Sequence, residues 1–478
     1  MGCVRMPGGG SGLTVKVPGK PGRLRALLAG ATLLAGSGLA DGGPAAAVAR
    51  EAGHPGPRAA ALALVLHRGI NFSELPGRGP HASALPRGSQ SVPEPGNASL
   101  LEGVFCTSPA NCWAVGTYSP TPEVDLNEVL HWTGSVWKQV SVPSPAGSAT
   151  GDVSLLFGVR CFAASDCWAV GVYQINGGAD LDQALHWNGK KWSVVATPTP
   201  GGSLSGDINE LFEVVCPSSA NCWAAGRYGT QAGSTVLLNQ MLHWNGKRWA
   251  LASVPNPAGS ISGDINALNS VRCTSTTNCM AVGTYGTLGS SFNLLNEALR
   301  WNGTTWSQVT TPSPGGSASG GAFSELDGLG CTTVTNCWAV GSYGTSPGTS
   351  LNQALHWNGS AWSQVTTPEP NGTGSGASQQ LIGVTCSSAT NCWAVGNYGS
   401  TSGSPGFVLN QALHWDGGTW SLADTPEPGG AAGGDLNGLS AARCVSTTEC
   451  WAVGTARMSS GSQFGQVLHW NGIAWSTG

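Results

Sequence analysis

The sequence is poor in charge. Only 10% of its 478 residues are Asp, Glu, Lys or Arg, whereas about 25% is typical of soluble proteins. It has no run of Lys and Arg and a formal net charge of −4, so the electrostatic footprint of a nucleic-acid-binding protein is missing. Tyr and Phe are scarce, with 6 and 9 residues. The chain is still 40% hydrophobic, which excludes a simply disordered protein.

What the chain has instead is glycine, tryptophan and cysteine, with 72, 20 and 15 residues. The excess of Trp over other aromatics indicates one motif used many times. The cysteines form pairs with five residues between the partners, and the pairs recur every 55–58 residues. In an exported chain such an even set predicts a disulfide framework. The predicted pairs are Cys106 with Cys112, Cys161 with Cys167, Cys216 with Cys222, Cys273 with Cys279, Cys331 with Cys337, Cys386 with Cys392 and Cys444 with Cys450.

The N-terminus has the order of a secretory signal peptide. A basic leader is followed by an apolar stretch over residues 26–40 and by the small residues 47–49, which predicts a signal peptide over residues 1–49 and a secreted protein. The apolar stretch is too short for an ordinary membrane span, and no other segment is longer, so no transmembrane anchor is expected in the mature chain. Glycines and the basic flank disfavour the alternative of a buried core helix. Residues 50–98, rich in Pro and Gly, predict a tether.

Each repeat contains four short apolar runs bounded by turn residues. In the second repeat they cover residues 156–161, 167–173, 183–187 and 192–195, and their length and Trp/Val content predict strands. Asn188-Gly189 predicts a hairpin between the last two runs, because both residues tolerate positive φ. Seven such units predict an all-β fold, a seven-bladed β-propeller with four antiparallel strands per blade over residues 99–478. An open solenoid or an array of separate modules are the alternatives.

The two ends of the repeat region complement each other. The last repeat stops at residues 475–478, which match the first four of nine positions seen in residues 137–145. Residues 91–95 match the other five. Residues 87–95 are therefore predicted to complete the last blade and close the ring, which would protect a sheet edge. The alternative is that this Pro-x-Pro stretch is a linker remnant.

The recurring residues have structural interpretations. A disulfide across the first hairpin of each blade would contribute roughly 2 kcal/mol. Zinc binding is disfavoured, because each pair supplies two ligands where structural zinc needs four. The Trp residues are predicted to pack between blades rather than stack on sugars. The histidines are predicted to make structural hydrogen bonds, since each lies on a different blade: His131, His186, His243, His356, His414 and His469, with Arg300 in the fourth repeat.

The long loops are the predicted place for a ligand. Strand parity brings the loop after the second strand and the connection between blades to the same face, and long loops on a rigid scaffold often carry function. The candidate ligand-binding residues are Asp152, Asp207, Asn209, Asp264, Asn266, Asp435 and Asn437. A second polar set precedes the His or Arg, with three residues between them: Asn127, Asp182, Asn239, Asn296, Asn352 and Asn410. Such side chains could bind sugar hydroxyls or Ca²⁺, or could simply cap turns. No cofactor and no metal site are otherwise expected.

One resemblance spans residues 99–478. The order Cys-Trp-Ala-Val-Gly-x-Tyr-Gly, then Leu-His-Trp-Asn-Gly-x-x-Trp-Ser, then Pro-x-Pro resembles kelch-type repeats, although the kelch double glycine is absent and the cysteine pairs are foreign to kelch. The chain also looks like repeat arrays in secreted proteins of high-GC bacteria. The resemblance implies a propeller and no particular function.

Enzyme motifs are scarce. Galactose-oxidase-like copper chemistry needs a free Cys, and sialidase-like propellers need an arginine cluster and Ser-x-Asp boxes, neither of which the sequence indicates. The sequence favours a secreted, non-catalytic, monomeric binding or scaffold protein that contacts a glycan, a cell-wall polymer or a protein through its long-loop face. The alternative is an extracellular polysaccharide-acting enzyme with carboxylates in the central funnel, with Glu128, Glu210, Glu213, Glu297 and Glu325 as candidates. A purely structural surface protein is the third interpretation.

Overall fold

The computed structural model describes residue 96 and residues 98–478, apart from residues 231–234, 288–292, 317–321, 347, 401–406, 460 and 462. Within these residues the chain forms 28 strands and no helix, so this part of the chain contains no helix that could span a membrane. The predicted signal peptide and the predicted tether up to residue 95 lie outside the described residues.

Consecutive strands pair in fours, and each group of four is one blade. Blades 1 to 3 contain β1 (Ala98–Ser108), β2 (Asn111–Thr121), β3 (Val124–Trp132) and β4 (Trp137–Gln139); β5 (Val153–Ala163), β6 (Asp166–Gln174), β7 (Leu181–Trp187) and β8 (Trp192–Val195); and β9 (Asp207–Ser218), β10 (Asn221–Thr230), β11 (Val236–Trp244) and β12 (Trp249–Leu251). Blades 4 and 5 contain β13 (Asp264–Ser275), β14 (Asn278–Thr287), β15 (Asn293–Trp301) and β16 (Trp306–Gln308); and β17 (Phe323–Thr333), β18 (Asn336–Gly344), β19 (Leu351–Trp357) and β20 (Trp362–Val365). Blades 6 and 7 contain β21 (Ala377–Ser388), β22 (Asn391–Ser400), β23 (Phe407–Trp415) and β24 (Trp420–Ala423); and β25 (Leu436–Ser446), β26 (Glu449–Arg457), β27 (Gln463–Trp470) and β28 (Trp475–Thr477).

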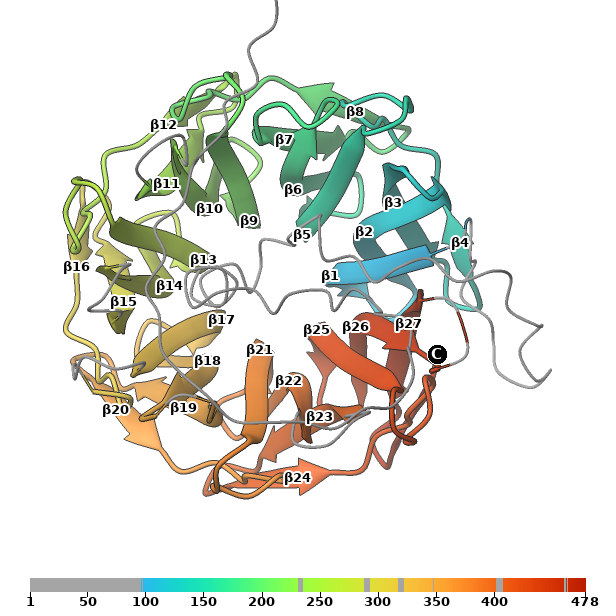
Figure 1. Ribbon diagram of the computed structural model, residues 1–478, viewed down its shortest axis with the longest axis vertical. Coiled ribbons are helices and arrows are strands. Elements are labelled where there is room, and N and C mark those ends of the chain that lie inside the picture. Colours follow the sequence, from blue (N-terminus) through green and yellow to red (C-terminus); the bar gives the residue numbers. More distant parts are fainter. Residues whose placement is uncertain are drawn as a thin grey trace, which may run out of the picture. The chain divides into compact units, whose positions relative to one another are not determined.

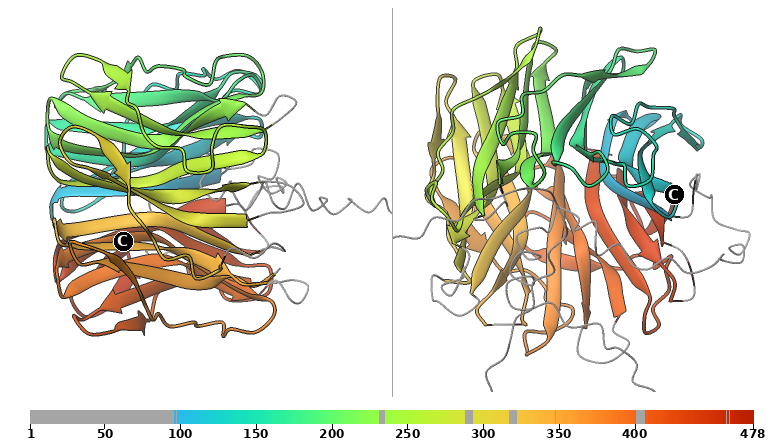
Figure 2. Two further views of the ribbon diagram at one scale, coloured as in Figure 1. Left: turned by 90° about the vertical axis from the view of Figure 1, so that its left-hand side faces the viewer. Right: turned by 45° about the horizontal axis from the view of Figure 1, so that its top comes forward.

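The blades form a closed ring. The first strands β1, β5, β9, β13, β17, β21 and β25 surround the centre, and the short fourth strands lie at the rim (Figure 1). Each first strand contacts that of the next blade, and β1 contacts β25, β26 and β27, so blade 1 packs on blade 7. Figure 2 shows the strands running between the two faces of this ring. The described residues are a β-propeller, as the sequence predicts, and not a solenoid or separate modules.

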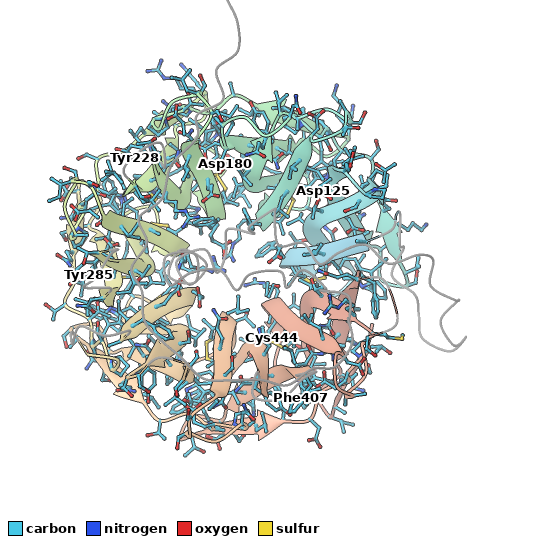
Figure 3. All side chains as sticks on the ribbon, in the orientation of Figure 1. Asp125, Asp180, Tyr228, Tyr285, Phe407 and Cys444 are labelled. Atoms are coloured by element: carbon cyan, nitrogen blue, oxygen red, sulfur yellow. A yellow bond between two sulfur atoms is a disulfide. The ribbon has the colours of Figure 1, made fainter. Side chains whose placement is uncertain are left out.

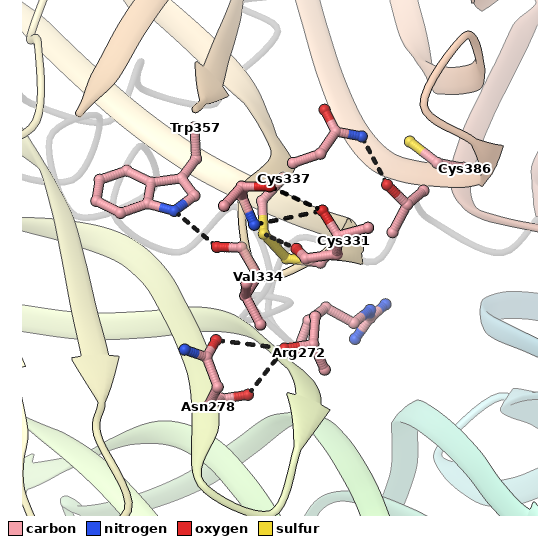
Figure 4. Close-up of a disulfide and its surroundings, with 12 residues drawn as sticks. Arg272, Asn278, Cys331, Val334, Cys337, Trp357 and Cys386 are labelled. Carbon is pink, nitrogen blue, oxygen red and sulfur yellow. Dashed lines mark hydrogen bonds between the residues drawn. A yellow bond between two sulfur atoms is a disulfide. The ribbon is translucent and has the colours of Figure 1, made fainter. Parts of the chain in front are cut away.

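All seven predicted disulfides are confirmed. In each blade the two cysteines lie on the first and second strands, with Cα atoms 3.9–4.1 Å apart. The bridges join Cys106 to Cys112, Cys161 to Cys167, Cys216 to Cys222, Cys273 to Cys279, Cys331 to Cys337, Cys386 to Cys392 and Cys444 to Cys450. Figure 4 shows the fifth bridge, beside the Trp357 indole that donates to the Val334 carbonyl at 3.2 Å. Disulfides in this number indicate an oxidising environment.

The main apolar contact between blades is made by the Trp that follows the second Cys. Trp113 of blade 1 is 1% exposed and packs against Trp187 and Trp192 of blade 2, with ring centroids 5.0 and 5.3 Å apart. The same arrangement closes the ring, where Trp451 of blade 7 meets Trp132 and Trp137 of blade 1 at 4.8 and 5.3 Å. The predicted inter-blade role of the Trp residues is therefore confirmed.

The Asn-Gly turns differ from the predicted type. Gly189 has a φ of +86°, but Asn188 does not have a positive φ. The Asn188 carboxamide oxygen instead accepts the N–H groups of Lys190 and Lys191 at 3.0 and 3.1 Å. The turn therefore needs one left-handed residue, and the Asn side chain stabilises it by capping the backbone.

A second set of inter-blade contacts is polar. Asn127 Nδ2 of blade 1 donates to the side-chain oxygen Oε1 of Gln183 at 2.8 Å, and Gln183 Nε2 of blade 2 donates back to Asn127 Oδ1 at 3.0 Å. Asn410 and Gln466 make the same reciprocal pair between blades 6 and 7, with both bonds at 2.9 Å. These side chains are buried, and each such hydrogen bond contributes about 1 kcal/mol. The polar set ahead of the histidines thus includes residues that bridge blades.

Trp338, which packs on Trp415 and Trp420 at 4.7 and 5.0 Å, provides a test of the Trp contact. We expect Trp338→Ala to lower the free energy of unfolding by about 3–5 kcal/mol, because it leaves a cavity between blades 5 and 6. Trp338→Met should cost much less, since Met280 fills the corresponding position between blades 4 and 5. Urea unfolding measures both; equal losses for the two variants would contradict this view of the contact.

The predicted closing segment, residues 87–95, lies outside the described residues, so closure by the N-terminus stays a prediction. Blade 7 has its own fourth strand, β28, as long as β4, β12 and β16. In blades 5 and 6 the middle residue of Pro-x-Pro, Glu369 or Glu427, accepts the backbone N–H of Asn352 or Asn410 at 3.1 or 3.0 Å. Glu94 is the corresponding residue of the closing segment in the sequence.

If Glu94 makes the same contact with blade 7, deletion of residues 87–95 should lower the melting temperature by several degrees, because blade 7 would lose that hydrogen bond. Deletion of residues 78–86 removes the same length of predicted tether and should leave the melting temperature unchanged. Differential scanning calorimetry compares the two. Equal melting temperatures for both deletions would show that residues 87–95 are only a linker.

Candidate functional site

The predicted loop residues have defined structural contacts. The carboxylates of Asp152, Asp207, Asp264 and Asp435 each accept the backbone N–H three residues earlier, at 2.8–2.9 Å. Figure 3 labels Asp180, whose backbone carbonyl accepts the Asn209 side-chain amide at 3.1 Å. Asn209, Asn266 and Asn437 are each 0% exposed and bond the backbone of the loop between blades. These contacts match the turn-capping alternative, and a ligand role for the seven residues stays a prediction.

The histidines do not meet one another. His131 stacks on Trp113 with centroids 4.1 Å apart, and its Nε2 lies 2.6 Å from the Asn111 carboxamide oxygen. His186 and His469 contact the Asp166 and Glu449 carboxylates in the same way, at 2.8 and 2.9 Å. Burial lowers the pKa of His131, His243, His356 and His414. Among the described residues no His, Cys, Asp and Glu side chains gather into a group of three that could hold a metal ion.

The sequence suggests five candidate carboxylates, all of which the structure describes. Of these five, Glu213 alone lines the cavity on the ring axis. Glu210 forms a buried ion pair with Arg227, with 2.6 Å between Oε2 and Nε. Glu128 accepts from the Ser99 hydroxyl at 2.5 Å, and Glu297 accepts from Asn239 at 2.6 Å. Glu325 is 2% exposed within blade 5. Glu213 lines a cavity on the axis, together with Glu102.

This axial cavity has a volume of about 60 Å³ and is lined by all seven first strands. Its lining residues lie in the middle and the second half of the first strands, toward the disulfide hairpin. The charged ones are Glu102, Arg160, Glu213, Arg272 and Arg443. The sequence predicts no arginine cluster, and this expectation is wrong. Arg160, Arg272 and Arg443 are far apart in the chain, but the ring brings them to one cavity.

The arginines occupy one repeated position, immediately before the first Cys of the blade. The seven residues there are Phe105, Arg160, Val215, Arg272, Gly330, Thr385 and Arg443. Strand register is the same in each blade that carries an arginine: Arg160 pairs with Trp168, Arg272 with Met280 and Arg443 with Trp451. A position that varies in chemistry inside an otherwise regular repeat is the sequence signal that could have found this site.

Phe105 and Glu213 organise the cluster. The guanidinium carbons of Arg160 and Arg443 lie 4.4 and 4.5 Å from the Phe105 ring centroid, within the range of cation–π attraction. Arg272 pairs with the Glu213 carboxylate at 3.0 Å. Arg443 Nε is buried without a hydrogen-bond partner among the described residues. The cluster thus contains three guanidinium groups. Two of them lie on the Phe105 ring, and the third, that of Arg272, is paired with the Glu213 carboxylate.

Electrostatic repulsion acts within the cluster. Burial and the charges of Arg272 and Arg443 hold the pKa of Arg160 well below its ordinary value, and Glu213 opposes this shift. Burial and the charge of Arg272 lower the pKa of Arg443 to about 10, so this side chain is still a cation at neutral pH. An anion in the cavity would relieve this repulsion and could accept hydrogen bonds from the guanidinium groups, which favour carboxylate and phosphate.

Comparison with known proteins finds no matching family model and no matching curated protein. The kelch-like resemblance therefore stays a prediction. Solved structures similar to this chain include YCF48 bound to a D1 peptide, at 12% identity, 82% of this chain, 99% of that chain and a TM-score of 0.42. The propeller domain of the Trilobed protease from Pyrococcus furiosus is 7% identical, covers 80% of this chain and 97% of that chain, and has a TM-score of 0.43. An ulvan lyase bound to a sugar ligand is 9% identical, covers 82% of this chain and 96% of that chain, and has a TM-score of 0.42.

Proposed function

We propose that this protein is a secreted, non-catalytic binding protein whose ligand places a small anionic group in the axial cavity. The observation that carries the proposal is the convergence of Arg160, Arg272 and Arg443 on one cavity, where three cations meet. Building the propeller does not need these arginines, since other blades have Val215, Gly330 or Thr385 at the same position. The site differs from the long-loop face that strand parity alone suggests.

The size of the cavity limits what it can hold. At about 60 Å³ it is far smaller than the roughly 300–1,000 Å³ pockets that enclose drug-sized ligands. It suits a carboxylate or phosphate group and a few waters rather than a whole sugar ring. The ligand could be an acidic glycan, a cell-wall polymer or a protein that inserts one anionic group, with the rest of its mass outside the cavity.

Binding of small anions tests the proposal. We expect acetate, glucuronate or phosphate to bind in isothermal titration calorimetry, and Arg443→Gln to weaken the affinity at least about tenfold through loss of a charge-assisted hydrogen bond. Arg160→Gln should act in the same direction. Phe105→Leu should also weaken binding without changing the charge, because Phe105 holds the two guanidinium groups in place.

Arg248 supplies the matched control. It is exposed in the turn before β12, so Arg248→Gln removes the same charge from outside the cavity and should leave affinity unchanged. If Arg248→Gln weakens binding as much as Arg443→Gln, the effect is nonspecific. If none of the anions binds, the proposed site is wrong.

The second candidate is a polysaccharide-acting enzyme. It is favoured by one observation, that two carboxylates, Glu102 and Glu213, line the axial cavity, because glycoside hydrolysis uses a pair of carboxyl groups. Turnover of an acidic polysaccharide that is lost in Glu213→Gln would support the enzyme. Anion binding without turnover would support the binding protein.

A further inference from the structure

The polar contacts between blades use one Asn position and one Gln position, and three acids stand at these positions: Asp182, Glu297 and Glu128. Glu128 accepts from the Ser99 hydroxyl. Of the amide junctions, Asn296 with Gln353 and Asn352 with Gln411 keep buried atoms without a hydrogen-bond partner among the described residues, so the fully bonded pairs are the reference.

Blades 1 and 2 are joined by Asn127 and Gln183, a neutral amide pair with two hydrogen bonds. Between blades 2 and 3 the Asn position is occupied by Asp182, and between blades 3 and 4 the Gln position is occupied by Glu297. Both acids are buried, with 3% and 0% exposure.

At the junction of blades 3 and 4, one of the two hydrogen bonds is missing. Asn239 Nδ2 donates to Glu297 Oε1 at 2.6 Å and to the Pro255 carbonyl at 2.8 Å. The other two atoms of the pair, Asn239 Oδ1 and Glu297 Oε2, are both buried without a hydrogen-bond partner among the described residues. In the neutral pair the corresponding atoms are joined by the Gln183 N–H. Two oxygen acceptors cannot bond unless one carries a proton.

The junction of blades 2 and 3 has the same defect in mirror image. Gln240 Nε2 donates to Asp182 Oδ2, while Asp182 Oδ1 and Gln240 Oε1 are buried with no partner in the described part of the chain. In the neutral pair this second bond is donated by the Asn127 amide. Here again a single proton on the carboxyl group would supply the missing donor.

Strand register supports this interpretation at Glu297. Glu297 stands opposite Gly283 as Gln183 stands opposite Gly171. Gln183 Nε2 also donates to the backbone carbonyls of Leu155 and Val172, both at 2.8 Å. The Gln position is therefore built around acceptors, and an ionised carboxylate there would face oxygen atoms, which is costly when buried.

We propose that Asp182 and Glu297 are neutral carboxylic acids in the folded protein, each donating its proton to the amide oxygen of the neighbouring blade. The two junctions are then acid–amide pairs with two hydrogen bonds each, equivalent to the amide–amide pair of Asn127 and Gln183. Ionisation of either acid breaks one bond and leaves a buried charge between blades.

The surroundings agree with neutral acids. Burial raises the pKa of Asp182 well above its ordinary value; Glu210 adds to the shift and the bond from Gln240 opposes it. Burial raises the pKa of Glu297 in the same way, opposed by the bond from Asn239. The other titratable groups facing them are Tyr173 for Asp182 and Tyr285 for Glu297. Arg227 and Asp180 lie next to Glu210. Burial and the charge of Glu210 raise the pKa of Asp180 to about 7.

The sign of the pH effect follows from these raised pKa values. Above the ordinary pKa of an unfolded carboxyl, about 4, the folded chain holds a proton at each site that the unfolded chain has lost. Stability therefore falls as pH rises from about 4 through neutral, until the folded acids ionise. Glu369 and Glu427, whose pKa values are raised to about 7 by burial, add a background of the same sign.

Variants that keep Glu369 and Glu427 share their contribution to the pH dependence, so a comparison with wild type isolates the effect of Asp182 and Glu297. We expect the double variant Asp182→Asn/Glu297→Gln to melt at or above the wild-type temperature at pH 5. At pH 8 it should melt several degrees higher than wild type, because its amides cannot ionise. Asn127→Asp is the reverse control: it places an acid in the neutral junction and should lose stability above pH 5 more steeply than wild type.

Infrared spectroscopy gives a readout that does not depend on stability. At pH 7 the wild type should show the carbonyl band of buried protonated carboxyl groups, and this band should weaken in the double variant. Parallel melting curves for wild type and double variant from pH 5 to 9, or an unchanged infrared band, would overturn the proposal.

Discussion

The insertion of one Trp per blade between two Trp residues of the next blade is the contact on which the ring depends. Seven such contacts, with Met280 replacing Trp once, run around the ring and return to blade 1 through Trp451. Each blade buries its second-strand side chains only because a neighbour covers them, so an isolated blade would expose both faces. The disulfides act within blades and the Trp contacts act between them, so the two kinds of stabilisation complement each other.

The architecture was predictable from the sequence because repetition supplies many copies of one signal. The period of the cysteine pairs, the strand-length apolar runs and the Asn-Gly turns all indicated four strands per unit. The turn type was not predictable from Asn188-Gly189 alone. The backbone of Asn188 does not have a positive φ, and its side chain caps the turn by accepting backbone N–H groups. Local propensity could not distinguish these two ways of closing a turn.

The candidate site was not predictable, because no local repeated signal marks it in the sequence. Arg160, Arg272 and Arg443 are more than 100 residues apart in the chain, and only ring closure brings them to one cavity. The Asp and Asn residues that recur in the loops are conspicuous in the sequence because they repeat, yet their hydrogen bonds are those that build the loops. The loop residues that recur regularly thus have structural contacts. The axial arginines instead occupy a position whose residue type changes from blade to blade.

The residue before each first Cys therefore has an unusual freedom. It is fixed in place by the disulfide that follows and by the shared strand register, yet Phe, Arg, Val, Gly and Thr all occupy it without a change in the blade. Six of these seven residues line the axial cavity, whereas Val215 packs in the core between blades 3 and 4. The charge and size of the cavity lining therefore differ from blade to blade while the strand register stays the same, which separates the chemistry of the axis from the architecture of the blades.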